Sequence, residues 1–136
     1  MRKILAFLML FMALNLVAGE QMQIILKNKN GEFGVVLDDT KVARSFATQL
    51  PLTLNLEDYA NHEKVARLKT PLDTSEAPRG ADGKKGELSY FAPWKNFVIY
   101  YGYQPYYDGI VRLGEILGDI DKVAIDGEVT IELISR

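Results

Sequence analysis

The 136-residue sequence has no cysteine and one histidine, and each shortage excludes a class of chemistry. Without cysteine there is no disulfide framework, thiolate metal site or cysteine nucleophile. One imidazole is too few for the common histidine-rich metal sites. Asp119, Asp121 and Asp126 together resemble the carboxylate ligands of a calcium-binding loop, but Ala124 occupies the position where such a loop needs glycine. We therefore predict neither a metal nor a cofactor.

Motifs of nucleotide and hydrolase chemistry are also missing. The sequence contains no Gly-x-Ser-x-Gly elbow, no Walker loop and no Gly-x-Gly-x-x-Gly fingerprint. It has no basic excess either, since 16 Lys and Arg stand against 18 Asp and Glu, and this balance disfavours nucleic acid as a partner. With 48% hydrophobic and 25% charged residues, the length fits one folded domain.

The N-terminus has the pattern of a secretory signal peptide. Arg2 and Lys3 precede an apolar run over residues 4–17, which ends in small residues. A membrane anchor is the alternative, but a helical run of this length spans about 21 Å, less than the roughly 30 Å hydrocarbon core. We predict that residues 1–19 are a signal peptide and that residues 20–136 form a periplasmic or secreted domain, with no membrane contact after cleavage. Cleavage removes two basic and no acidic residues, which changes the formal net charge from −2 to −4.

Alternating apolar and polar residues predict a chain made mainly of short strands. Residues 21–27 and 32–37 flank Asn30-Gly31, a pair that suits the tight turn of a β-hairpin. Leucines alternate with polar residues over 50–56, as in a strand with one buried face. Further strands are predicted over residues 64–68, 87–92, 97–103, 111–117 and 129–133, with Asp126-Gly127 as another hairpin turn.

Helix is confined to one clear segment and one short turn. Residues 38–40 supply N-cap oxygens, and apolar side chains recur every four residues from Val42 to Leu50. This spacing predicts a helix of about ten residues that Pro51 ends. Residues 118–122 predict a turn or short helical piece, and residues 69–86 a long surface loop. Without βαβ alternation, these elements predict an antiparallel barrel or sandwich.

Several segments together resemble a known family. Residues 50–54 (LPLTL), the pair Glu63-Lys64 and residues 90–97 (YFAPWKNF) are similar to the bacterial cyclophilin-like family of short stand-alone domains. Residues 108–116 (DGIVRLGEI) resemble the late Asp-Gly segment of cyclophilins. The resemblance covers nearly all of residues 22–135. It implies a mainly β fold, a closed eight-stranded antiparallel barrel with one clear α-helix and a short helical turn.

The resemblance also implies a peptide-binding groove of the prolyl-isomerase kind. Prolyl isomerisation needs an apolar cup for the proline ring and a donor, usually Arg, that weakens the double-bond character of the amide. Cyclophilins carry this Arg in a Phe-His-Arg motif, whereas the corresponding residues 52–56 contain no basic residue. Arg67 on the next predicted strand is the substitute candidate. Its alternative role is a solvated charge near Glu63.

Aromatic residues are concentrated in one part of the chain. Nine of the twelve aromatics that follow residue 19 lie within residues 90–107. Alternation along the predicted strand places Phe97 and Tyr101 on one face and Tyr100 on the other, so at least one aromatic face is expected to be partly exposed. Such rings form a binding surface, or else they make cross-strand pairs that stabilise the sheet, and the sequence leaves both interpretations open.

We predict an exported domain that binds an extended peptide or small ligand through an aromatic-lined groove, without strong isomerase activity. A weakly active peptidyl-prolyl isomerase and an accessory module of an envelope protein complex are the alternatives. Expected partners are a peptide, a protein or a small molecule. His62, Arg79 and Arg112 are expected at the surface. The predicted ligand-binding residues are Tyr90, Phe91, Trp94, Tyr101, Arg67 and Glu63, with Arg67 as the candidate catalytic residue.

Overall fold

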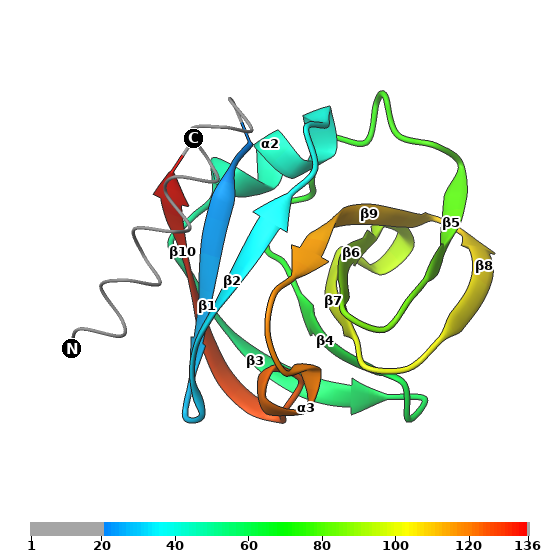
Figure 1. Cartoon of the computed structure of the whole chain (residues 1–136). Helices are drawn as coiled ribbons and strands as arrows, with labels where there is room; N and C mark the ends of the chain where they lie inside the picture. The colour runs from blue at the N-terminus through cyan, green and yellow to red at the C-terminus, as the bar shows by residue number, and fades with distance from the viewer. Residues whose placement is uncertain (1–20, 136) are drawn as a thin grey trace.

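Eight antiparallel strands close into a barrel in the computed structural model, which describes residues 21–135 (Figure 1). The neighbours around the barrel run β1-β10-β3-β4-β7-β6-β9-β2. This arrangement confirms the predicted barrel, whereas the predicted signal peptide lies outside the described residues. The barrel strands are β1 (Gln23–Asn28), β2 (Gly31–Leu37), β3 (Leu52–Tyr59), β4 (Glu63–Arg67), β6 (Glu87–Phe91), β7 (Asn96–Tyr100), β9 (Ile110–Ile116) and β10 (Gly127–Ser135).

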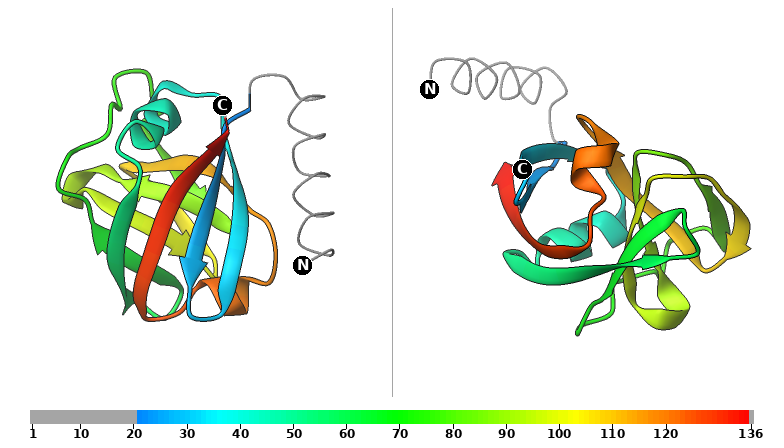
Figure 2. Two further views of the ribbon diagram at one scale, coloured as in Figure 1. Left: turned by 90° about the vertical axis from the view of Figure 1, so that its left-hand side faces the viewer. Right: turned by 90° about the horizontal axis from the view of Figure 1, so that it is seen from below.

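Two short helices lie at opposite ends of the barrel (Figures 1 and 2). In α2 (Lys41–Ala47), Thr40 is the N-cap, and its hydroxyl accepts a hydrogen bond from the backbone N–H of Ala43 at 3.2 Å. Phe46 points from this helix into the core and packs on Phe97, with 5.7 Å between the ring centroids. At the other end, α3 (Ile120–Val123) buries its two terminal side chains. The predicted ten-residue helix is thus shorter, because residues 48–50 continue as a turn.

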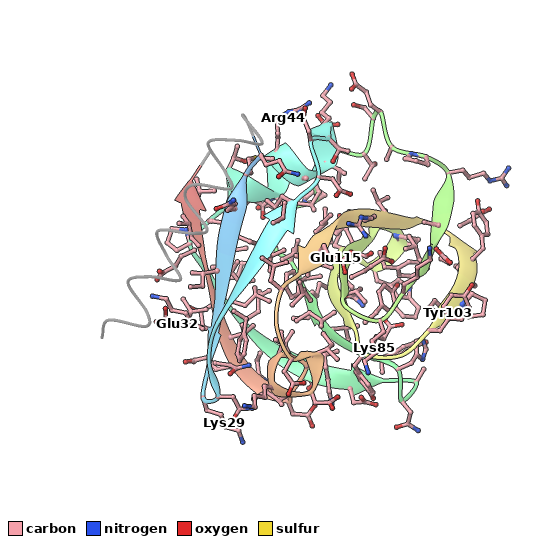
Figure 3. All side chains as sticks on the ribbon, viewed as in Figure 1. Lys29, Glu32, Arg44, Lys85, Tyr103 and Glu115 are labelled. Carbon is pink, nitrogen blue, oxygen red and sulfur yellow. The ribbon has the colours of Figure 1, made fainter. Side chains whose placement is uncertain are left out.

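Strand alternation fills the barrel with apolar side chains (Figure 3). On β7, Phe97 and Ile99 belong to the hydrophobic core, while Val98 and Tyr100 are buried on the outer face. On β6, Leu88 and Tyr90 point inward in the same way. Because Val98 and Tyr100 are buried although they point outward, another part of the chain must cover the barrel wall at β6 and β7.

The cover is a two-stranded ribbon formed by β5 (Gly80–Gly83) and β8 (Gln104–Asp108). It lies beyond β6, β7 and β9 in Figure 1. Gly83 permits its close approach, because a Cβ atom there would lie 2.4 Å from the Tyr100 ring. The interpretation of residues 69–86 as loop throughout is therefore wrong for β5. Strand β8 could not be predicted from the sequence, because Pro105 and two adjacent tyrosines disrupt the alternation of apolar and polar residues.

Asp126-Gly127 is not the hairpin turn that the sequence predicts. The strand before it, β9, pairs with β2 and β6, while the strand after it, β10, pairs with β1 and β3. The chain crosses the end of the barrel through α3 between these strands, and Gly127 begins β10 with φ of 108°. An Asp-Gly pair suits any turn with positive φ, so the pair alone does not identify which strands it joins.

Candidate functional site

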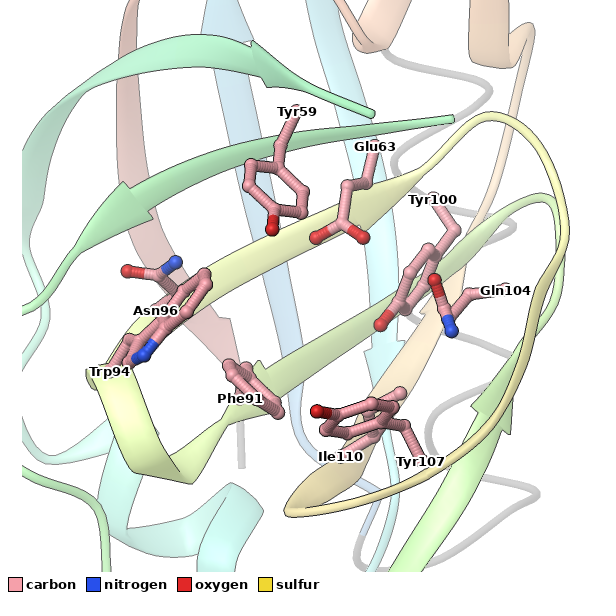
Figure 4. Close-up of a pocket in the computed structure, with 9 residues that line it drawn as sticks. All are labelled: Tyr59, Glu63, Phe91, Trp94, Asn96, Tyr100, Gln104, Tyr107 and Ile110. Carbon is pink, nitrogen blue, oxygen red and sulfur yellow. The ribbon is translucent and has the colours of Figure 1, made fainter. Parts of the chain in front are cut away.

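A pocket of about 170 Å³ opens on the outer face of the barrel, between the wall and the ribbon (Figure 4). Strands β4, β6 and β7 supply one side of it, and β8 supplies the other. Tyr100 forms part of its floor and is only 1% exposed, because the ribbon lies over the ring. The lining residues are Tyr59, Glu63, Phe91, Trp94, Asn96, Tyr100, Gln104, Tyr107 and Ile110.

Four aromatic rings make a continuous wall around this space. The centroid distances are 5.8 Å for Tyr59 and Trp94, 5.2 Å for Trp94 and Phe91, and 5.8 Å for Phe91 and Tyr107. All three contacts are edge-to-face, an arrangement that aromatic quadrupoles favour. Trp94 is 45% exposed and Tyr107 is 58% exposed, so the rings retain accessible surface after packing on one another. The rings therefore pack on one another and still present accessible aromatic surface to the pocket.

The local sequence explains how Trp94 reaches the rim. Pro93 lies in the 3₁₀ turn η1 (Ala92–Trp94), where its fixed φ angle suits the first turn of a helix. Lys95 follows in the left-handed region with φ of 57° and ends the turn. The chain then enters β7 directly, so Trp94 and Asn96 both face the pocket.

Glu63 is the acidic group of the pocket. It is 8% exposed and lies opposite Tyr100 in the register of β4 and β7. Burial raises the pKa of Glu63, and nearby Asp58 raises it further, whereas His62 lowers it. Oε1 lies 3.0 Å from Nε2 of His62. Oε2 has no hydrogen-bond partner within residues 21–135 and retains solvent access. In Figure 4 the carboxylate points into the space between the rings.

His62 is not the exposed loop residue that the sequence predicts. Its side chain is largely covered, and its ring stacks on Tyr100 with 6.4 Å between centroids. Nδ1 lies 3.0 Å from the carbonyl oxygen of Ala60, and Nε2 lies 2.7 Å from Oε1 of Gln104. The Gln104 amide nitrogen donates to the Pro105 carbonyl at 2.9 Å, which orients its oxygen toward the imidazole. His62 is thus a positioning residue that holds Glu63 and Gln104 at the pocket.

Tyr100 contributes a neutral hydroxyl. Burial, with the neighbouring carboxylates of Glu63 and Glu87, raises the pKa of Tyr100 well above its ordinary value. The phenol therefore stays protonated across the physiological range and acts as a hydrogen-bond donor or acceptor, not as a charge.

The structure brings together three of the six predicted ligand-binding residues: Glu63, Phe91 and Trp94 line the pocket. Tyr90 points into the barrel, where its hydroxyl accepts a hydrogen bond from the N–H of Leu72 at 3.2 Å. Tyr101 lies past the end of β7 and donates a hydrogen bond from its hydroxyl to Asp58. Arg67 is exposed at the far end of β4, about 13 Å along the strand from Glu63.

The prediction missed six lining residues: Tyr59, Asn96, Tyr100, Gln104, Tyr107 and Ile110. Tyr107 was visible in the sequence as a member of the aromatic cluster. Tyr59 and Gln104 had no comparable signal, because they come from the end of β3 and from the ribbon, whose position depends on strand pairings distant in sequence.

The most connected arginine lies away from the pocket. Arg112 on β9 donates from Nε to Asp38 at 2.9 Å, and from Nη1 to Glu115 at 3.1 Å and to Glu87. Three carboxylates thus contact its guanidinium, so Arg112 joins the segment between β2 and α2 to β6 and β9. Among residues 21–135 no group of three or more side chains has the composition of a metal site. No helix in this part of the chain is long and apolar enough to cross a bilayer.

Comparison with known proteins identifies relatives of this fold. The model of the cyclophilin-like family matches residues 26–133. The solution structure of a hypothetical protein from Archaeoglobus fulgidus is similar, with a TM-score of 0.60 and 17% identity over 85% of this chain and 97% of that one. A search of curated proteins finds no match. At 17% identity the structural likeness supports the fold alone.

Proposed function

This chain belongs to the cyclophilin-like family, and from this premise we propose that it is a binding domain whose outer pocket accepts one side chain of an extended peptide, or a small ligand of similar size. The observation that carries the proposal is the convergence of four partly accessible aromatic rings on one space. Aromatic side chains supply contact area at low entropic cost, which favours them at recognition sites.

The size of the pocket supports an occupant of side-chain dimensions. Pockets for drug-sized ligands have volumes of about 300 to 1,000 Å³, whereas this one has about 170 Å³. The pocket also opens beside β8, the outer strand of the ribbon pair. An extended peptide that inserts one side chain satisfies both the small volume and the open surface around it.

The proposed activity is binding without strong prolyl isomerisation. Catalysis of the isomerisation needs a preorganised donor beside the prolyl amide, and the described residues that line the pocket include neither Arg nor Lys. Arg67 stands outside the lining, and Arg112 is engaged by three carboxylates.

Export is part of the proposal and depends on the sequence of residues 1–19 alone. The basic start, apolar run and small-residue end of this segment motivate it. Protein expressed with its own leader is expected to begin near Gly19 or Glu20 when its intact mass is measured. A full-length species retained in the membrane would overturn the proposal of cleavage.

Trp94 provides a direct test of binding, because it is the only tryptophan and lies at the pocket rim. We expect its fluorescence to change saturably with at least one member of a panel of blocked pentapeptides that differ only in the central residue. Tyr103→Ala is the matched control, since Tyr103 is an exposed aromatic outside the lining, and this variant should bind as the wild type does (Figure 3).

Two results would count against the proposal. If no peptide of the panel changes Trp94 emission and none perturbs the side-chain amide resonances of Asn96 and Gln104, the pocket is not a peptide site. If Pro-containing peptides bind and the chain also accelerates their cis-to-trans relaxation strongly, the domain is an isomerase and the non-catalytic assignment is wrong.

A further inference from the structure

We propose that the pocket selects an organic cation, an alkylammonium or quaternary ammonium group carried by a peptide side chain or by a small molecule. The inference rests on the proposed binding function and specifies the chemical class of the ligand. Its basis is the combination of aromatic walls with one buried carboxylate, in a pocket whose described lining holds no positive charge.

The aromatic wall has the geometry of a cage. Consecutive ring planes from Tyr59 through Trp94 and Phe91 to Tyr107 meet at 81°, 89° and 65°. The first two pairs are thus nearly perpendicular and the third is steeply inclined, so the rings surround the space at an angle to one another and do not form one flat stack. In Figure 4 the rings surround a common opening. Ring faces carry negative electrostatic potential and attract a cation within about 6 Å of their centroids.

Glu63 gives the cage a formal charge. Burial of a carboxylate costs free energy unless the group is paired, and His62 pairs with Oε1 only, at 3.0 Å. Oε2 has no hydrogen-bond partner among residues 21–135 and retains solvent access, and the carboxylate points into the pocket (Figure 4). A cation in the cage would supply the second partner.

The other lining groups fit the same ligand class. Asn96, Gln104 and the tyrosine hydroxyls are neutral, so nothing in the lining would repel a cation or bind an anion by charge. The raised pKa of Tyr100 keeps that hydroxyl neutral, and its causes include the carboxylates of Glu63 and Glu87. His62 contacts Glu63 and Gln104 and is not part of the lining.

A pair of isosteric probes tests the charge preference. Choline and 3,3-dimethylbutan-1-ol have nearly the same shape, but only choline carries a charge. Both are titrated into the full chain, with Trp94 fluorescence and calorimetry as readouts. We expect choline to bind at least about tenfold more tightly than the neutral probe.

Two variants identify the source of the preference. Glu63→Gln should weaken choline binding about tenfold and change the affinity for the neutral probe less than about twofold. Glu57→Gln, an exposed carboxylate-to-amide change on β3, is its matched control and should leave both affinities unchanged. Tyr107→Leu keeps an apolar group but removes one ring face. It should therefore weaken the binding of choline and leave the binding of the neutral probe unchanged. Tyr107 is an exposed residue, so this variant keeps the test valid even if Glu63→Gln fails to fold.

The outcomes separate this inference from the proposed function. Equal or tighter binding of 3,3-dimethylbutan-1-ol would overturn the cation preference while leaving the pocket a binding site. Binding of neither probe would also overturn the preference, and the pentapeptide panel then decides the binding function independently. Choline binding that survives both Glu63→Gln and Tyr107→Leu unchanged would place the cation elsewhere and overturn the inference.

Discussion

Tyr90→Ala is expected to lower the free energy of unfolding by about 3 to 5 kcal/mol, the usual cost of removing a large buried aromatic ring. Tyr90 is only 1% exposed, and its ring belongs to the core. The change also removes the acceptor for the backbone N–H of Leu72, which would remain buried without a partner. Urea denaturation followed by far-UV circular dichroism measures the loss.

Tyr90→Phe is the matched variant, because it keeps the ring and removes only the hydroxyl. It should cost about 1 kcal/mol, the typical net value of one hydrogen bond. The sequence alone placed Tyr90 among the ligand-binding residues, and that role predicts a different result. A change below about 1 kcal/mol for Tyr90→Ala, combined with loss of ligand binding, would restore Tyr90 to the binding surface.

Trp94→Ala has the opposite expected profile. Trp94 is 45% exposed and lies in the short turn η1, where its ring packs on Tyr59 and Phe91, so its removal should cost no more than about 1 to 1.5 kcal/mol of stability. Binding of the tightest pentapeptide should weaken at least about 30-fold, the equivalent of the 2 kcal/mol that marks a binding hot spot. Calorimetry measures the affinity, since this variant lacks the fluorescent reporter.

Tyr103→Ala again serves as the control, because it removes an exposed ring that does not line the pocket. Its affinity and stability should both stay close to those of the wild type. If Trp94→Ala unfolds the chain instead, with a stability loss similar to that of Tyr90→Ala, then Trp94 is a structural plug and the pocket loses its principal recognition residue. Unchanged peptide affinity in a folded Trp94→Ala variant would equally contradict the proposed site.

The local pattern of the sequence determined most of the barrel. The Asn30-Gly31 turn, the leucine alternation over residues 50–56 and the cap at Thr40 each depend on neighbours within a few residues, so the corresponding elements could be predicted from those residues. The concentration of aromatics over residues 90–107 also singled out Phe91 and Trp94, which line the pocket. The blocks at residues 50–54 and 90–97 also pointed to the correct family.

Only the tertiary structure decided which aromatics line the pocket and which support the core. Tyr90 and Phe91 are adjacent in sequence, yet the alternation of a strand sends one into the barrel and the other into the pocket, and the burial of β6 fixes which is which. The sequence predicted that at least one aromatic face of the strand from residue 97 would be partly exposed but left open which one, and the ribbon of β5 and β8 covers the Tyr100 ring. The meeting of Glu63, Tyr59 and Gln104 was likewise not readable from the sequence, because pairings between segments far apart in the chain set their positions. Such pairings depend on the closure of the whole barrel, a property that no local pattern of residues contains.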